Sequence, residues 1–218
     1  ARRVPSPTIL RDSVAGLVAY AAADLDTLWA GLVSADQARE ALMDVLPALV
    51  ETYGRAAATV AADWYDDTRI EQGVRGRFTA APAALREPGA DELARWGIDP
   101  LFGRNPDWGA ARTLVAGGLQ RRIANASRET IMNSSNADPQ AEGWQRTGSG
   151  DCDFCNLLIG RGAVYSEATA DFAAHDNCRC AAQPSWKGRP RPVRPYTPSV
   201  RQNRADYDRA REWIATNM

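Results

Sequence analysis

The sequence contains little histidine, lysine and cysteine, and no long apolar segment. His175 is the only histidine, and Lys187 is the only lysine among 26 basic residues. The formal net charge of −1 gives no overall attraction to nucleic acid or to an anionic surface. No apolar run approaches the roughly 18 residues of a membrane span. No apolar run follows Arg2 and Arg3, so a secretory signal is not expected either, and the cysteines should stay reduced.

The single histidine excludes several classes of enzyme. A Ser/His/Asp or Cys/His site needs a histidine base beside the nucleophile, and an HNH nuclease needs several histidines. A zinc deaminase needs a His-x-Glu motif ahead of Pro-Cys-x-x-Cys, which this chain lacks. Gly160-Arg-Gly162 is too short to form a phosphate-binding loop. We therefore expect no catalytic residues and no enzymatic activity.

All four cysteines and the histidine are close together in the sequence. They are Cys152, Cys155, His175, Cys178 and Cys180. Cysteine and histidine at such short spacings are typical of tetrahedral zinc sites. Because a structural Zn²⁺ takes four ligands, we expect four of these five to bind it. The preferred set is Cys152, Cys155, His175 and one of Cys178 or Cys180, with Cys180 slightly favoured.

Other uses of these cysteines are conceivable. Four cysteines can form two disulfides, and they can also remain free thiols. A catalytic zinc would need an open coordination position and a carboxylate base. Four acidic residues lie near the cysteines: Asp153, Glu167, Asp171 and Asp176. A cysteine-rich ligand set donates much charge to the ion and weakens its Lewis acidity, which favours a structural zinc.

Two amphipathic helices are predicted in the first third of the chain. Apolar residues spaced by three and four predict a helix over about Asp12–Leu32, after an extended segment over residues 1–10. A second helix begins with Ser34-Ala-Asp-Gln37, which is a capping-box pattern. Its apolar stripe runs from Ala38 to Trp64, and Pro47 should kink or break it. This stripe fits an intramolecular helical hairpin or, alternatively, a docking face for another subunit.

A third long helix is predicted over about Trp108–Asn133, with Asp107 as its N-cap. Three arginines on it, Arg121, Arg122 and Arg128, are interpreted as a solvated face or as contacts to nucleic acid or an acidic partner. A short helix is predicted over about Glu87–Trp96. The segment from Asn133 to Pro139 has the composition of a loop.

Short strands are predicted around the cysteines, over Trp144–Thr147, Val164–Tyr165 and Cys178–Ala182. The predicted fold class is therefore mainly α, with long amphipathic helices and a small zinc-strapped, β-rich module near the C-terminus, α+β overall. The predicted division is a helical arm (1–70), an irregular connector (71–106), the module (107–183), a basic proline-rich strap (184–198) and a C-terminal helix (199–218).

The strap is the most basic part of the chain. It carries Lys187, Arg189, Arg191 and Arg194 among closely spaced prolines. Such a segment adopts an extended, polyproline-like conformation. We expect it to be a linker that contacts a partner protein or nucleic acid.

The cysteine-rich window resembles the C-terminal module of MuF-like phage head morphogenesis proteins. The resemblance rests on Cys152-x-x-Cys155, Gly162, Tyr165 and His175-Asp-Asn-Cys178-Arg-Cys180, and it extends over about Arg112–Trp186. The family typically has His-Pro-Asn-Cys-Arg-Cys, so Asp176 replaces a rigid turn residue.

The resemblance implies a minor capsid protein of a tailed phage, especially one with an actinobacterial host. Such a protein is made in the host cytoplasm and is found in several copies in the virion, at the portal vertex or the inner capsid face. Its expected partners are the portal protein, the major capsid protein and possibly packaged DNA, with no membrane. The alternative is a zinc-dependent nucleic-acid-binding protein.

Overall fold

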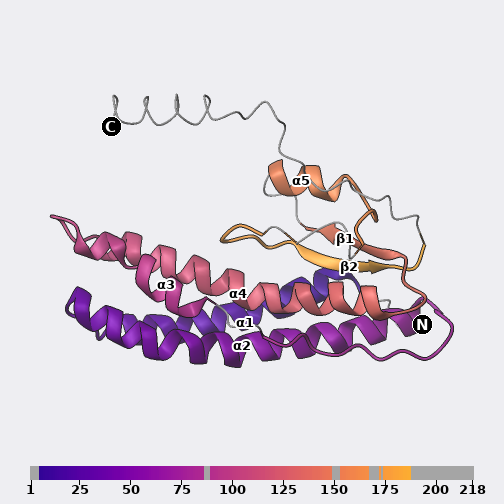
Figure 1. The fold of residues 1–218 in the computed structure, drawn as a ribbon, viewed down its shortest axis with the longest axis horizontal. Coiled ribbons are helices and arrows are strands. Elements are labelled where there is room, and N and C mark those ends of the chain that lie inside the picture. The colour runs from indigo at the N-terminus through magenta and orange to yellow at the C-terminus, as the bar shows by residue number, and fades with distance from the viewer. Residues whose placement is uncertain (1–4, 86–88, 149–152, 167–171, 173, 188–218) are drawn as a thin grey trace, which may run out of the picture.

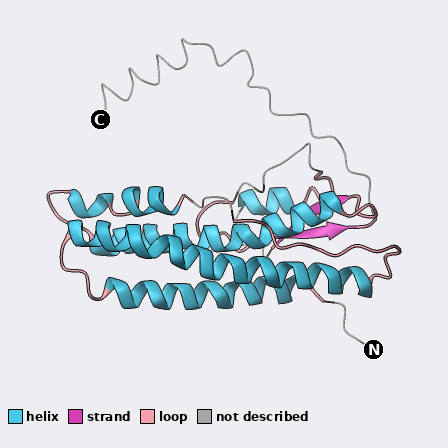
Figure 2. Cartoon of the chain, turned by 60° about the horizontal axis from the view of Figure 1, so that its bottom comes forward, coloured by secondary structure: helices cyan, strands magenta, loops and turns pink. Residues whose placement is uncertain are grey.

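Three long helices form the body of the molecule (Figure 1). The computed structural model describes residues 5–85, 89–148, 153–166, 172 and 174–187. The long helices are α1 (Pro7–Trp29), α2 (Ala35–Glu71) and α4 (Trp108–Ala137). A short helix, α3 (Ala90–Trp96), and the 3-10 turn η1 (Asp99–Phe102) complete the bundle, whose helices extend along one common direction in Figure 2.

A small antiparallel sheet lies on α4 (Figure 1). Its strands are β1 (Gly143–Thr147) and β2 (Ala181–Ser185), and the short helix α5 (Asp153–Ile159) follows β1. Tyr165 adds a single bridge to Trp144 on the outer side of β1. The predicted class, mainly α with a small β module that carries the Cys/His cluster, is confirmed for the described residues.

Both predicted helix caps are present. The Ser34 hydroxyl accepts a hydrogen bond from the amide of Gln37 at 3.2 Å, and the Gln37 side chain accepts one from the amide of Val33 at 2.9 Å. The Asp107 carboxylate accepts one from the amide of Ala110 at 2.8 Å. These side chains satisfy backbone donors that the first turn of a helix leaves unpaired.

Two predicted helix boundaries are wrong, and of the two outcomes predicted at Pro47, a kink or a break, the break does not occur. Helix α1 begins at Pro7 rather than near Asp12, because proline fits the first helical position, where no backbone donor is needed. Helix α2 continues through Pro47 without a break. Helix α4 continues past Asn133 to Ala137, although the composition predicts a loop from Asn133 onward. The buried Ser135 hydroxyl donates a hydrogen bond to the carbonyl of Ile131 at 2.7 Å within this last part of the helix.

The predicted apolar stripe of α2 packs inside the chain. Its buried members are Ala38, Leu42, Leu49, Ala57 and Trp64. Helices α1 and α4 cover this face, so the hairpin interpretation holds and α4 joins the hairpin as a third helix. Helix α3 approaches α4 closely at Gly118, where a Cβ atom would lie 2.4 Å from Leu93.

A buried ion pair joins the ends of α2, α4 and β2. The Asp138 carboxylate accepts hydrogen bonds from Arg69 at 2.8 Å, from Tyr65 at 3.2 Å and from the Trp186 indole at 3.0 Å. Burial alone would raise the pKa of Asp138, but the hydrogen bonds from Arg69, Trp186 and the Gln140 amide lower it. The same burial, together with the negative charge of Asp138, raises the pKa of Tyr65. Asp138 therefore remains ionised and holds three elements together.

The boundary predicted between residues 183 and 184 falls inside β2. Pro184 is a buried member of this strand and lies opposite Trp144. Trp144 directs its backbone amide and carbonyl to Tyr165, so the pair with Pro184 has no backbone hydrogen bond. Pro184 therefore turns its nitrogen, which has no proton, to the outer edge of the sheet. The rest of the strap and the predicted helix over 199–218 lie outside the described residues.

Replacement of Asp138 by Asn should lower the free energy of unfolding by about 3 kcal/mol, because it leaves the Arg69 guanidinium buried without its counter-charge. Denaturant titration measures this loss. Glu51→Gln is the matched control: it removes an exposed ion pair with Arg55 and should cost less than about 0.5 kcal/mol.

The contribution of the Arg69–Asp138 pair to the free energy of unfolding should depend on pH. An unfolded aspartate has a pKa of about 3.9, and the folded value of Asp138 is lower. The pair therefore stabilises the fold fully above about pH 4, and its contribution is lost as the pH falls through the folded pKa. The stability difference between the two chains should be constant from neutral pH to about 4 and should shrink below it. A difference that shrinks as the pH rises from 4 to 7 would contradict this assignment.

Candidate metal centre

Three of the predicted ligands converge on one point. The Sγ atom of Cys155 lies 3.8 Å from the Sγ atom of Cys178 and 3.7 Å from Nε2 of His175. The three donor atoms all lie within 4.8 Å of one another. Cys155 is buried on α5, whereas His175 and Cys178 precede β2, with the histidine exposed. The cluster therefore joins two segments that are distant in the sequence.

The spacing of these atoms fits a tetrahedral metal. Zinc–sulfur bonds of about 2.3 Å and zinc–nitrogen bonds of about 2.0 Å imply about 3.8 Å between two sulfurs and about 3.6 Å between sulfur and nitrogen. The measured separations agree with both values. Nδ1 of His175 lies 2.7 Å from the carbonyl oxygen of Asp176, and donation of its proton there leaves the Nε2 lone pair for the metal. The cluster can therefore hold a metal ion.

Cys178, rather than Cys180, completes this group of three. The Cys180 sulfur lies against the backbone at Gly148, where a Cβ atom would approach it to 2.7 Å. The Cys180 thiol also lies beside this group, since it is hydrogen-bonded to the sulfurs of Cys178 and Cys155, so the choice between Cys178 and Cys180 as a ligand stays a prediction. Cys152, the remaining candidate, lies outside the described residues. Among the described residues, no disulfide joins Cys155, Cys178 and Cys180 to one another.

Neighbouring groups favour the thiolate form of Cys178. Its pKa is lowered, chiefly because the Cys180 thiol donates a hydrogen bond to its sulfur, and further because the Arg128 cation is nearby. The pKa of Cys180 is raised for the complementary reason, since its proton is held by Cys178. A metal binds the thiolate and not the thiol, so Cys178 has the form that a ligand needs at neutral pH.

Arg128 fixes the backbone that carries these cysteines. Its Nη2 donates to the carbonyl of Cys178 at 2.6 Å, its Nε to the carbonyl of Cys180 at 2.9 Å, and its Nη1 to the Asn125 side chain at 2.7 Å. The side chain is 2 % exposed, so its interpretation as part of a solvated face is wrong. Burial lowers its pKa to about 10, and it remains a cation at neutral pH.

Arg121 and Arg122, the other two arginines interpreted above as a solvated face or a partner contact, also serve the fold. Arg121 forms an ion pair with Asp176 at 3.3 Å, and Arg122 donates to the carbonyl of Gly89. Asp176 and Asn177 form a turn that lies on α4 at Gly117, where a Cβ atom would be 3.3 Å from Asp176. The ion pair with Arg121 thus anchors this turn on α4.

A second buried arginine lies beside the sulfurs. Nη1 of Arg146, on β1, is 3.6 Å from the Cys155 sulfur and 3.9 Å from the Cys178 sulfur, and Nη2 donates to the Phe172 carbonyl. The guanidinium groups of Arg146 and Arg128 lie 4.0 and 4.8 Å from the centre of the Phe172 ring. The charge of Arg128 is favoured by the three cysteines and opposed by Arg146. The Cys178 thiolate, which lies beside both guanidinium groups, therefore serves as counter-charge for these buried cations.

The sequence contained signals for both arginines. Arg146 is two residues from buried Trp144, and alternate residues of a strand share a face. Arg128 lies four residues after Ala124 and three before Ile131, both of which are buried. Each arginine thus follows the period of the buried positions around it.

The remaining predicted residues lie away from the donor atoms or outside the described residues. Asp153 is exposed on α5, and Lys187 is exposed beyond β2. Glu167, Asp171, Arg189, Arg191 and Arg194 lie outside the described residues. None of the described helices has the length and apolarity needed to cross a membrane.

Comparison with known proteins identifies one family. Residues 7–210 match the model of a family described as VG15 protein. No curated protein and no solved structure matches the chain.

Arg128→Gln should lower the metal affinity by roughly 10- to 100-fold, because the carbonyls of Cys178 and Cys180 lose their donors and the ligand segment loosens. Chelator competition measures the affinity. Arg112→Gln is the matched control, because it removes an ion pair that another arginine of α4 forms with Asp26 on α1. This variant should leave the metal affinity unchanged. Equal metal affinity in the two variants would show that Arg128 does not hold the ligand segment.

Proposed function

Because this chain belongs to the VG15 protein family, which indicates a phage (viral gene) protein, we propose that it is a structural minor capsid protein of a tailed phage. It acts at the portal vertex or the inner capsid face, in head assembly, DNA packaging or ejection, through protein–protein contacts. It is made in the host cytoplasm and carried in the virion in several copies.

The observation that carries this proposal is the convergence of Cys155, His175 and Cys178 on one point above α4. These residues belong to the motif on which the resemblance to MuF-like head morphogenesis proteins rests. The spacing of the donor atoms supports the view that the motif is a folded unit and not a chance similarity of sequence.

The metal in this proposal is a structural Zn²⁺ bound by Cys155, His175 and Cys178, with Cys152 as the fourth ligand. Cys152 precedes α5 and is separated from Cys155 by two residues, a common spacing in zinc sites. A two-stranded sheet and a seven-residue helix bury little apolar surface by themselves. A metal ion supplies the missing folding free energy in such modules.

The chemistry of the site supports a structural role and not a catalytic one. Zinc occupies the lone pair of the only histidine, so no histidine base is left for catalysis. Arg146 and Arg128 surround the sulfurs with positive charge and with Phe172, and neither side chain can act as a general base at neutral pH. The module therefore works by presenting surfaces to partners, which we propose are the portal protein and the major capsid protein.

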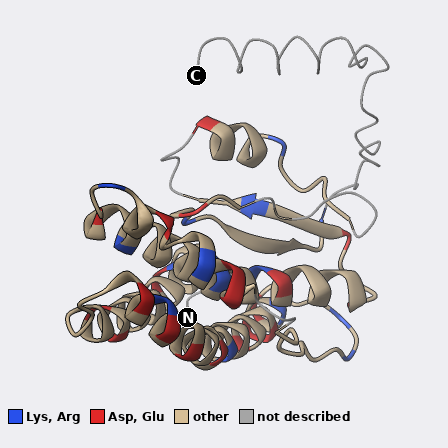
Figure 3. Ribbon diagram, turned by 60° about the vertical axis from the view of Figure 1, so that its left-hand side comes forward, with Lys and Arg blue, Asp and Glu red and all other residues tan. Residues whose placement is uncertain are grey.

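Charge distribution argues against the alternative of a nucleic-acid-binding protein. Acidic side chains outnumber basic ones along α1 and α2 (Figure 3). A surface of this kind repels the phosphate backbone. Contact with packaged DNA is restricted in this proposal to the basic strap with Lys187, Arg189, Arg191 and Arg194.

The zinc assignment predicts about one equivalent of bound zinc in protein purified under reducing conditions. Cys152→Ser, Cys155→Ser and Cys178→Ser should each lose most of it, whereas Cys180→Ser should retain it. Metal analysis and thermal unfolding measure both effects. Less than about half an equivalent in a folded chain would refute the assignment, and zinc loss in Cys180→Ser alone would exchange the roles of the two cysteines.

The virion role predicts that the chain co-purifies with the portal protein of the same phage and stays bound at high salt. Apolar and hydrogen-bonded protein interfaces tolerate salt, whereas phosphate contacts weaken steeply as salt rises. Retention on immobilised portal protein is compared with retention on duplex DNA across a salt series. Binding to DNA alone, lost as salt rises, would favour the nucleic-acid-binding alternative.

A further inference from the structure

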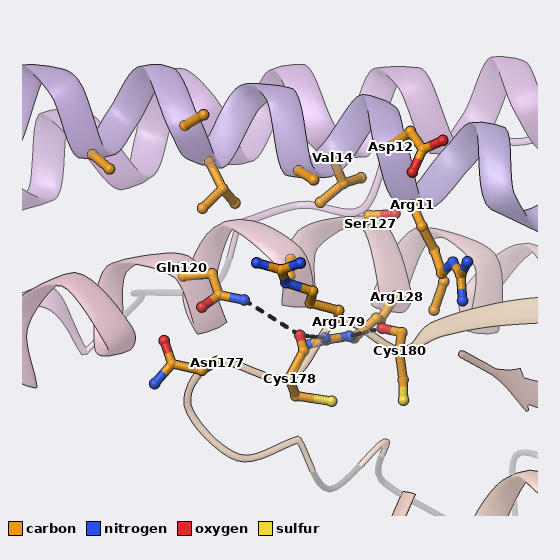
Figure 4. A pocket seen from close by; sticks show the side chains of 16 residues that line it. Arg11, Asp12, Val14, Gln120, Ser127, Arg128, Asn177, Cys178, Arg179 and Cys180 are labelled. Atoms are coloured by element: carbon orange, nitrogen blue, oxygen red, sulfur yellow. Dashed lines mark hydrogen bonds between the residues drawn. The ribbon is translucent and has the colours of Figure 1, made fainter. Parts of the chain in front are cut away.

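A groove runs along α1 on the side that faces the cysteine-bearing segment (Figure 4). It encloses about 470 Å³ between α1, α4 and residues 177–181. The α1 wall consists of small apolar residues, namely Val14, Ala15, Val18, Ala19 and Ala22. Ala15 and Ala19 are exposed in the described structure, so this wall is open to a partner. We refer to this cavity as the α1 groove.

The α1 groove carries excess positive charge. Its lining contains three arginines, Arg11, Arg128 and Arg179, and one acidic residue, Asp12. Arg128 is fully used in holding the carbonyls of Cys178 and Cys180. Arg11 and Arg179 form no hydrogen bond or ion pair with any other described residue. Their side chains project into the groove from α1 and from the cysteine segment, on opposite sides (Figure 4).

Helix stability does not explain the position of Arg11. It lies one turn from the start of α1, where the helix macrodipole is positive and favours acidic residues. The first turn of α1 contains no acidic residue and its N-cap Ser6 makes no side-chain cap. The helix dipole therefore adds to the positive charge of Arg11 at this end of the groove, where Asp12 is the one acidic residue of the lining.

The apolar wall decides which kind of anion fits. The groove between Arg11 and Ala22 is roughly 16 Å long at 1.5 Å per helical residue, enough for about five residues of extended chain. A nucleic-acid backbone would place charged phosphates and polar sugars against alanine and valine, and the apolar wall would gain no apolar contacts. A peptide can place carboxylates on the arginines and small apolar side chains against the alanines.

We propose that the α1 groove binds an acidic segment of a partner protein. Carboxylates of the segment pair with Arg11 and Arg179, and its small apolar side chains pack against Ala15 and Ala19. The exposed carboxylate of Asp12 limits how much negative charge the bound segment can carry at the Arg11 end of the groove. This site is separate from the basic strap and does not depend on the virion role proposed above.

The test is selection of a displayed random-peptide library on the full zinc-containing chain, followed by affinity measurement with the selected peptides. The expected result is enrichment of peptides that combine Asp or Glu with Ala, Val or Gly. Arg11→Glu and Arg179→Glu should each weaken binding roughly tenfold, and Ala19→Leu should block the wall. Affinity should fall as salt rises.

Matched controls separate the groove from general charge and folding effects. Arg104→Glu changes an exposed arginine outside the groove, and Ala23→Leu changes an exposed alanine of α1 outside its lining. Both should leave affinity unchanged, and all variants should keep the zinc content and thermal unfolding of the parent chain. Enrichment of peptides without acidic residues, equal affinity of groove and control variants, or displacement of peptides by a single-stranded oligonucleotide at equal concentration would each overturn the proposal.

Discussion

The bidentate hydrogen bonding of Arg128 to the carbonyls of Cys178 and Cys180 is the constraint on which the C-terminal half depends. It ties the segment that carries two cysteines to the middle of α4 at 2.6 and 2.9 Å. In the part of the chain that the structure describes, the second edge of β2 has no strand partner, and the guanidinium supplies the donors that a third strand would otherwise provide just before this strand begins. A lysine could not serve both carbonyls in one plane, because its ammonium lacks the fixed geometry of the guanidinium group.

Two buried clusters of charged groups, which differ in their chemistry, hold the sheet against the helical bundle. Arg69 and Asp138 form an ion pair that is closed to solvent and is completed by Tyr65 and Trp186. Arg128 and Arg146 have sulfur as their counter-charge instead of carboxylate. The first pair is complete in the protein alone. Arg128 and Arg146 suit a metal centre in which cysteine thiolates carry negative charge. The two cations therefore complement the charge of the candidate ligands.

The helices could be predicted from sequence because local chemistry decides them. Ser34 and Asp107 cap their helices, and the stripe from Ala38 to Trp64 shows its buried face directly. The start of α1 and the end of α4 could not be predicted, because proline and serine, here Pro7 and Ser135, are typical of segments outside helices unless the tertiary contacts are known. Three of the five candidate ligands do converge, but Cys178 and Cys180 are both buried and their sulfurs are hydrogen-bonded to each other. Spacing alone does not determine which of the two binds a metal.

Pro184 has a consequence for how this molecule behaves among its own copies. A two-stranded sheet has edges whose free amides and carbonyls can recruit strands from neighbouring chains, which is a common route to aggregation. The nitrogen of Pro184 faces the outer edge of β2 and has no proton to donate, and α4 lies against the same sheet. The edge is therefore both covered and chemically blunted. A strand in which any other residue replaced this proline would carry an additional amide donor at its edge, available to extend the sheet if the contact with α4 opened.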